Sequence, residues 1–135
     1  MTIRVLTALA VLVSAAVHLY LWFSFASGDD VLGPGFMLNA VGGVVIALLL
    51  LAWRHWLPPL LAIGFGLATL TAFVLATQGM LFDVTASWGG WEVWTAAAAE
   101  VVAIVGGVLI LARRGRSGSG AQRQHHATPR RAHLD

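Results

Sequence analysis

Two ionisable side chains, His18 and Glu100, stand within long uncharged stretches of this 135-residue sequence. With a helical rise of about 1.5 Å per residue, His18 lies roughly 10 Å from one end of its stretch, and Glu100 lies roughly 9 Å from the corresponding end of its own. A carboxylate inside a membrane costs about 3 kcal/mol unless it is paired or protonated. We therefore predict that His18 is the partner of Glu100, with Asn39 as the next candidate.

Such an intramembrane pair has two interpretations. As an interhelical hydrogen bond it would fix the register of two helices, and this structural role is the one that we favour. As a proton-responsive pair facing the periplasm it would exchange a proton near neutral pH. Ser14, Asn39 and Gln78 lie at compatible depths and are the predicted supporting residues.

Other chemistries lack the residues that they need. The chain has no cysteine, which excludes thiol chemistry and thiolate metal sites. A bis-histidine haem needs a second membrane histidine, and His55 belongs to the opposite surface from His18. A catalytic zinc needs three protein ligands, and Asp29 with Asp30 is better explained as a solvated acidic turn than as a cation site. Hydrolase, nucleotide-binding and metalloprotease motifs are also missing, so we expect no metal, no cofactor and no catalysis.

The elements that position these residues follow from composition. With 59% hydrophobic and 10% charged residues, the chain has less than half the charge of a typical soluble domain. Uncharged runs at about 5–25, 36–53, 57–76 and 94–112 each have the length that a helix needs to cross a bilayer. Because the backbone must bond within its own segment there, the sequence predicts an all-α fold: an integral membrane four-helix up-down bundle.

Two boundaries complete this prediction. Residues 1–114 form the transmembrane domain, and residues 115–135 form a basic, disordered cytoplasmic tail because they lack the apolar residues to fold. The first run could instead be a signal peptide cleaved near Ser24–Ala26. Its apolar stretch is longer than that of a signal peptide, so we treat it as a retained helix.

Orientation follows from the arginines. The chain has no lysine, and all eight arginines fall on one side of a four-span topology. The other side has none and carries Asp29, Asp30, Asp83 and Glu92. By the positive-inside rule, both termini are predicted to be cytoplasmic.

Tryptophans lie near the ends of the predicted spans, where the ring is favoured at the membrane–water interface. The alternative to such a belt is an aromatic binding site at the outer surface. We favour the belt. The predicted belt consists of Trp22, Trp88, Trp91 and Trp94 at the outer surface and of Trp53 and Trp56 at the inner one.

A cluster of arginines, Arg113, Arg114 and Arg116, directly follows the fourth span. Such clusters attract anionic lipid head groups at about 1 kcal/mol per charge. The bilayer and its anionic head groups are therefore expected partners. Because the membrane accounts for the charges, the pI of about 10.5 does not indicate nucleic-acid binding.

Small residues recur on one face of each span, as close helix packing in lipid requires. The predicted faces are Ala10, Ser14 and His18 in the first span, Gly43 and Ala47 in the second, Gly64, Ala68, Ala72 and Ala76 in the third, and Ala99, Ala103 and Gly107 in the fourth.

Residues 18–22 (HLYLW) and 33–39 (GPGFMLN) resemble those of a group of small actinobacterial membrane proteins. The resemblance covers roughly residues 1–112 and implies four helices without an assigned activity. The chain is more distantly similar to DoxX-like four-helix proteins, some of which accompany quinone-linked redox enzymes. The resemblance and the arginine-only composition imply a bacterial plasma membrane.

These observations lead to one expected function and two alternatives. We expect an accessory or assembly subunit of a membrane complex, without catalysis of its own. The first alternative is a small proton-coupled transporter that acts as an oligomer through His18 and Glu100. The second is a redox accessory protein that holds a quinone near the outer tryptophans and His18.

Overall fold

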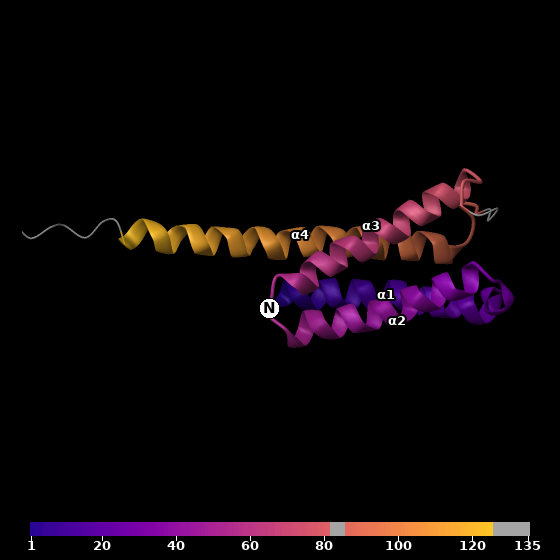
Figure 1. Cartoon of the computed structure of the whole chain (residues 1–135), viewed down its shortest axis with the longest axis horizontal. Helices are drawn as coiled ribbons and strands as arrows, with labels where there is room; N and C mark the ends of the chain where they lie inside the picture. Colours follow the sequence, from indigo (N-terminus) through magenta and orange to yellow (C-terminus); the bar gives the residue numbers. More distant parts are fainter. Residues whose placement is uncertain (82–85, 126–135) are drawn as a thin grey trace, which may run out of the picture.

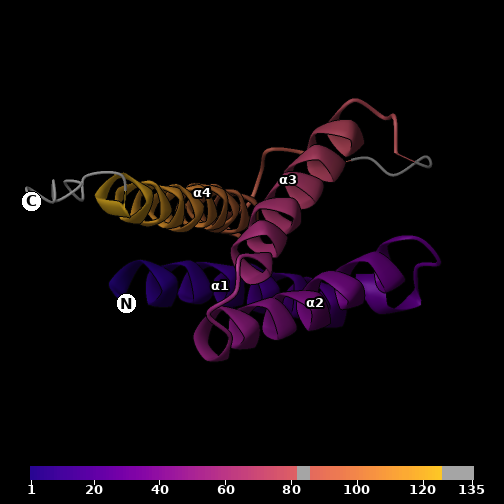
Figure 2. The same ribbon diagram turned by 60° about the vertical axis from the view of Figure 1, so that its left-hand side comes forward.

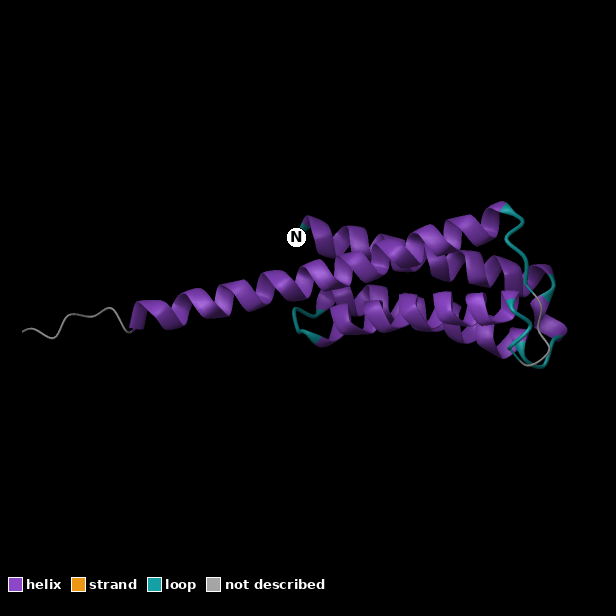
Figure 3. Ribbon diagram, turned by 90° about the horizontal axis from the view of Figure 1, so that it is seen from above, coloured by secondary structure: helices purple, strands orange, loops and turns teal. Residues whose placement is uncertain are grey.

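Each of the four uncharged stretches forms one α-helix in the computed structural model (Figure 1). The structure describes residues 1–81 and 86–125, and side chains as far as Arg116. Within that part, the elements are α1 (Thr2–Ser24), a 3-10 turn η1 (Ala26–Gly28), α2 (Leu32–Ala52), α3 (Leu57–Thr77) and α4 (Trp91–His125). No β-strand occurs among these described residues (Figure 3).

All four helices are long and apolar enough to cross a membrane. The helices α1, α2 and α3 have 23, 21 and 21 residues, and the apolar part of α4, Trp91–Arg116, has 26. A typical hydrocarbon core needs about 20 helical residues. The prediction of an all-helical protein with four candidate membrane helices is therefore confirmed.

Two helix boundaries differ by four residues or more from the sequence prediction. The helix α2 begins at Leu32 rather than at residue 36, because Pro34 falls in the first turn, where a missing N–H breaks no hydrogen bond. The helix α4 continues to His125, so residues 115–125 are helical and not disordered as predicted. Extending an existing helix avoids the cost of nucleation, and no proline interrupts this segment. The rest of the predicted tail, 126–135, lies outside the described residues.

The helices do not pack equally. The helix α1 packs along both α2 and α4, whereas α3 packs mainly on α4 and makes less contact with α2. Figure 2 shows that α3 is inclined to the other helices and diverges from α2 beyond the turn that joins them. The apolar stretches of α2 and α3 are accordingly less buried than those of α1 and α4.

The two ends of the bundle differ in charge. Figure 1 shows the start of α1 beside the turn between α2 and α3, with the other two connections at the opposite end. Asp83, which the sequence analysis assigns to the acidic side, lies outside the described residues. We name the ends by their charged residues: the arginine end has Arg4, Arg54 and Arg114, and the acidic end has Asp29, Asp30 and Glu92.

The core is built mostly from small side chains, so that the helix backbones approach closely. A Cβ atom added at Gly43 would lie 2.8 Å from the Ala15 Cβ, and one at Gly66 would lie 2.8 Å from the Glu100 carbonyl oxygen. The central cluster of buried residues consists of Ala8, Val11, Ala47, Leu50, Ala62, Ala103 and Ile110.

The predicted small-residue faces are buried on α1, α2 and α4, but the predicted face of α3 is wrong in part. Gly64 and Ala68 are exposed and Ala72 is half-buried, so only Ala76 of that face is buried. The helix α3 instead buries Ala62 and Gly66. A helix has about 3.6 residues per turn, so positions four apart rotate by about 40° at each step. A strict four-residue repeat therefore turns away from the contact over three steps.

Asp29 organises the connection between α1 and α2. Its Oδ1 accepts hydrogen bonds from the backbone N–H groups of Leu32 (2.7 Å) and Val31 (2.8 Å) at the start of α2. These two donors favour the ionised carboxylate and hold the pKa of Asp29 below its usual range. Asp29 thus caps the start of α2 through these two hydrogen bonds.

Candidate functional site

The centre of the candidate site is a hydrogen bond between α1 and α4. The Ser14 hydroxyl donates to Glu100 Oε1 over 3.0 Å. Ser14 is 0% exposed and Glu100 is 2% exposed, so this contact is shielded from the surroundings. It is a polar link between the two most extensively packed helices.

His18 lies one turn from Ser14 on α1 and bonds to the same residue. Its Nδ1 lies 2.8 Å from the Ser14 carbonyl oxygen and 3.5 Å from the Ser14 hydroxyl. A carbonyl oxygen can only accept, so Nδ1 carries the proton of this hydrogen bond. The imidazole ring also packs edge-on against Phe36 of α2, with 5.4 Å between ring centroids.

The predicted direct partnership of His18 and Glu100 is therefore replaced by a link through Ser14. Among the described residues, no hydrogen bond or ion pair joins His18 to Glu100, and Asn39 does not contact Glu100 either. The reason is local, since Nδ1 of a helical histidine can reach back to the carbonyl four residues earlier. This bond turns the ring towards α2 and leaves the short Ser14 side chain to meet α4.

Asn39 forms a second interhelical contact, between α2 and α3. Its Nδ2 donates to the Thr69 hydroxyl over 2.8 Å, and that hydroxyl donates to the Phe65 carbonyl oxygen over 2.9 Å. Within the part of the chain that the structure describes, the buried Oδ1 atom of Asn39 has no hydrogen-bond partner. Sequence reasoning identified Asn39 but missed Thr69, although a hydroxyl within the third span was a usable signal.

Gln78 does not belong to this polar layer. It is exposed at the end of α3, where its backbone N–H bonds to the carbonyl oxygens of Val74 and Leu75.

Thr7 is a buried polar residue that the sequence pattern did not single out. It is 1% exposed, and its hydroxyl donates to the Ile3 carbonyl oxygen over 2.7 Å. Its side chain lies against Gly106 of α4.

The tryptophans of the predicted belt lie at the two ends of the bundle and are open to the surroundings. Trp22 is half-buried. The other five, Trp53, Trp56, Trp88, Trp91 and Trp94, are 45–60% exposed. Trp88 contacts both Phe73 and Trp94, and Trp91 contacts Tyr20.

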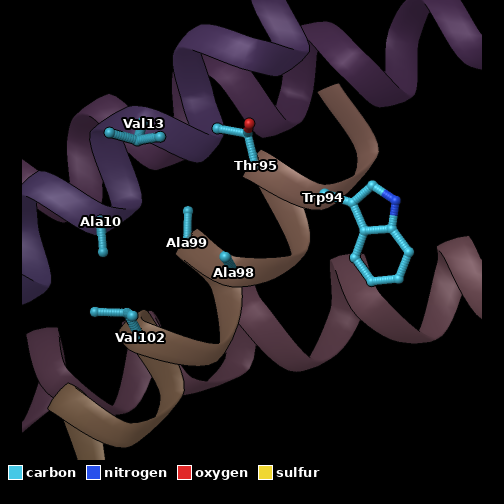
Figure 4. A pocket seen from close by; sticks show the side chains of 7 residues that line it. All are labelled: Ala10, Val13, Trp94, Thr95, Ala98, Ala99 and Val102. Atoms are coloured by element: carbon cyan, nitrogen blue, oxygen red, sulfur yellow. The ribbon is translucent and has the colours of Figure 1, made fainter. Parts of the chain in front are cut away.

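One hollow, of about 560 Å³, lies between α1 and α4 (Figure 4). Thr95 is its only polar lining residue, and the Thr95 hydroxyl is already bonded to the Trp91 carbonyl oxygen. Neither His18 nor Glu100 lines it. The lining residues are Ala10, Val13, Trp94, Thr95, Ala98, Ala99 and Val102.

Metal-binding chemistry has no matching arrangement in the described part of the chain. No group of three histidine, aspartate or glutamate side chains gathers there. The tail arginines Arg113, Arg114 and Arg116 are exposed at the C-terminal end of the apolar part of α4. No family model, curated protein or solved structure matches the chain, so its function has to follow from this geometry.

Proposed function

We propose that this chain is a multi-pass protein of a bacterial plasma membrane, with an up-down topology and both termini in the cytoplasm. Four apolar helices support the membrane location. The separation of Arg4, Arg54 and Arg114 from Asp29, Asp30 and Glu92 supports the orientation, because arginine-rich ends are retained in the cytoplasm. The resemblance to small actinobacterial membrane proteins supports a bacterial plasma membrane.

Within that membrane, the chain serves as an accessory or assembly subunit of a larger complex. Unequal burial is the observation that supports this function. Of the most apolar stretch of each helix, 44% is buried in α1 and 39% in α4, but only 22% in α2 and 17% in α3. The surfaces of α2 and α3 are where the membrane helices of a partner would pack.

The polar contacts fit a structural subunit. Ser14 and Glu100 join α1 to α4, and Asn39 and Thr69 join α2 to α3. Interhelical hydrogen bonds of this kind contribute about 1 kcal/mol in membrane proteins and fix helix register. The hollow of Figure 4 is lined almost wholly by apolar side chains, with the Thr95 hydroxyl and the Trp94 indole N–H as its polar groups, which also fits a structural role better than small-molecule chemistry.

Site-specific photo-crosslinking tests this proposal in the native membrane. A photoreactive residue would replace Leu38 on α2 or Leu67 on α3, which are 74% and 51% exposed. Matched control positions are Leu6 on α1 and Val105 on α4, at 55% and 51%. We expect Leu38 and Leu67 to crosslink to the same protein, which also co-purifies in stoichiometric amount, and the controls to crosslink to lipid.

Three outcomes would contradict the accessory function. Crosslinks to lipid at all four positions would mean that α2 and α3 have no protein partner. Crosslinks only to a second copy of the chain would favour the oligomeric transporter. A quinone extracted in stoichiometric amount from the purified protein would favour the redox accessory protein.

Proton-coupled transport is a second candidate because Glu100 is buried without a cationic partner among the described residues. Its described hydrogen bond comes from the neutral Ser14 hydroxyl, and a carboxyl in such a place is held protonated or marks a proton path. Glu100→Gln should then keep the fold and abolish proton flux in proteoliposomes. If the parent protein showed no proton flux and Glu100→Gln formed the complex normally, proton transport would be contradicted and the structural role of Glu100 would stand.

A further inference from the structure

The arginine end gathers three guanidinium groups from different helices. Arg4 of α1 donates from Nε to the Leu50 carbonyl oxygen (2.8 Å) and from Nη2 to the Trp53 carbonyl oxygen (2.6 Å). Arg114 of α4 donates from Nη1 to the carbonyl oxygen of Arg54 (2.8 Å), in the turn after α2. Both side chains are therefore held at the end of α2, beside a third arginine.

The position of these side chains has a clear physical cause. The last carbonyl groups of a helix lack intrahelical partners and carry partial negative charge, so they attract cations. Arg4 of α1 satisfies carbonyls at the end of α2, and Arg114 of α4 satisfies one in the turn that follows it. The resulting cluster is fixed by the backbone and does not depend on flexible chain termini.

The three arginines have positive charge that no nearby acidic side chain in the described part of the chain neutralises, and they have N–H donors that the backbone carbonyls do not use. The charges of Arg114 and Arg54 both repel that of Arg4. Every acidic side chain in the described part of the chain lies elsewhere, at the acidic end or, for Glu100, within the core. A guanidinium has five N–H donors, of which Arg4 uses two and Arg114 one on these carbonyls.

We propose that Arg4, Arg54 and Arg114 form a binding site for an anionic phosphate group. Guanidinium groups bind phosphate oxygens through paired N–H donors, and a convergent set of three neutralises its charge. The arginines that the sequence marks for lipid contact are those of α4 alone. The structure instead joins Arg114 to two arginines more than 50 residues away in the chain.

The neighbouring aromatic residues indicate that the phosphate belongs to a phospholipid. Trp53 and Trp56 are 45% and 50% exposed beside the cluster, and the His55 ring stacks on Trp53 at 4.7 Å. Exposed tryptophans favour the depth of the glycerol and head-group region. A lipid head group would reach the arginines while its acyl chains follow the apolar helices. This site is independent of the proposed protein partner.

Titration of the purified full-length chain with soluble phosphate ligands tests the site. The probes are dihexanoyl phosphatidylglycerol, dihexanoyl phosphatidylcholine and inorganic phosphate, followed by native mass spectrometry. We expect one phosphatidylglycerol to bind more tightly than phosphatidylcholine. Arg54→Gln should weaken this binding by about fivefold, the effect of one charge near a lipid surface, whereas Arg116→Gln should leave it nearly unchanged.

The two variants are matched because both remove one exposed arginine charge at the same end. Arg54→Gln also leaves all three described hydrogen bonds intact, since Arg54 contributes only its backbone carbonyl. Inorganic phosphate that competes equally well would support the site but assign it to a soluble anion. Equal losses in the two variants, or no loss in Arg54→Gln, would overturn the proposal.

Discussion

At the scale of single residues, the hydroxyl of Ser14 is the contact on which the buried carboxyl of Glu100 depends. No other hydrogen bond to Glu100 occurs within the described residues. A buried polar group that loses its partner pays the full cost of desolvation, whereas replacement by an isosteric acceptor costs little. Ser14 and Glu100 are therefore expected to respond very differently to conservative substitution.

Ser14→Ala should lower the free energy of unfolding by about 1–2 kcal/mol, because it leaves Glu100 buried without a donor. Glu100→Gln keeps an oxygen that accepts from Ser14 and should change stability by less than about 1 kcal/mol. Unfolding in mixed detergent–SDS micelles would measure both variants. An equal loss in the two would mean that the negative charge of Glu100, rather than its hydrogen bond, stabilises the fold.

Asp29 provides a pH-dependent contact outside the membrane helices. The N–H groups of Leu32 and Val31 lower its pKa by bonding to the carboxylate, so the helix cap is fully formed at neutral pH and is lost as the pH falls through that lowered pKa. The amide proton shifts of both residues, followed by NMR, should titrate with a midpoint below that of an unstructured aspartyl peptide. In Asp29→Asn these shifts should not titrate in this range. A midpoint equal to that of the peptide would contradict the cap.

At the scale of elements, α3 is positioned by close approaches to α4, one of which is at Gly66. A Cβ at Gly66 would lie 2.8 Å from the Glu100 carbonyl oxygen and 2.7 Å from the Ile104 Cγ1, whereas one at Gly64 would meet nothing within 4 Å. Substituting these two glycines of the same helix by alanine therefore distinguishes the effect of packing against α4, which only Gly66 has, from the effect of helix propensity, which both have. The same close approach explains why α3 leans on α4 rather than on α2.

Gly66→Ala should destabilise the protein by about 1–3 kcal/mol, because the contact with the backbone of α4 cannot shift cheaply. Gly64→Ala should be neutral or stabilising by up to about 1 kcal/mol, since alanine favours the helix. Thermal unfolding in detergent would compare them. If Gly64→Ala proved as harmful as Gly66→Ala, the four-residue face expected from the sequence would be the contact surface after all.

At the scale of the whole molecule, the separation of charge between the two ends sets the expected orientation. Because the chain has no native cysteine, single cysteines report on it without background. A membrane-impermeant maleimide applied to intact cells should label Asp30→Cys and should miss Ser117→Cys until the cells are opened. The reverse labelling pattern would mean that the termini face outwards.

Much of this architecture is determined by the sequence itself. The composition and the spacing of charge determine four membrane-length helices, because an uncharged run of about 20 residues has one stable form in hydrocarbon. The same local information identifies Ser14, His18, Asn39 and Glu100 as polar residues within the spans, although it misses Thr7 and Thr69. It also overestimates how much of the tail is disordered. Disorder was inferred from the polarity of residues 115–135, whereas α4 continues to His125.

Only the tertiary structure decided which of these residues meet. Depth along a helix axis is readable from the chain, but the rotation of each helix about its axis depends on packing. That rotation places Ser14 between His18 and Glu100, pairs Asn39 with Thr69, and exchanges Gly64 for Gly66 at the contact. It also assembles Arg4, Arg54 and Arg114 around the end of α2, a cluster that arises because unpaired carbonyls at the end of α2 and in the turn after it attract the guanidinium groups of α1 and α4.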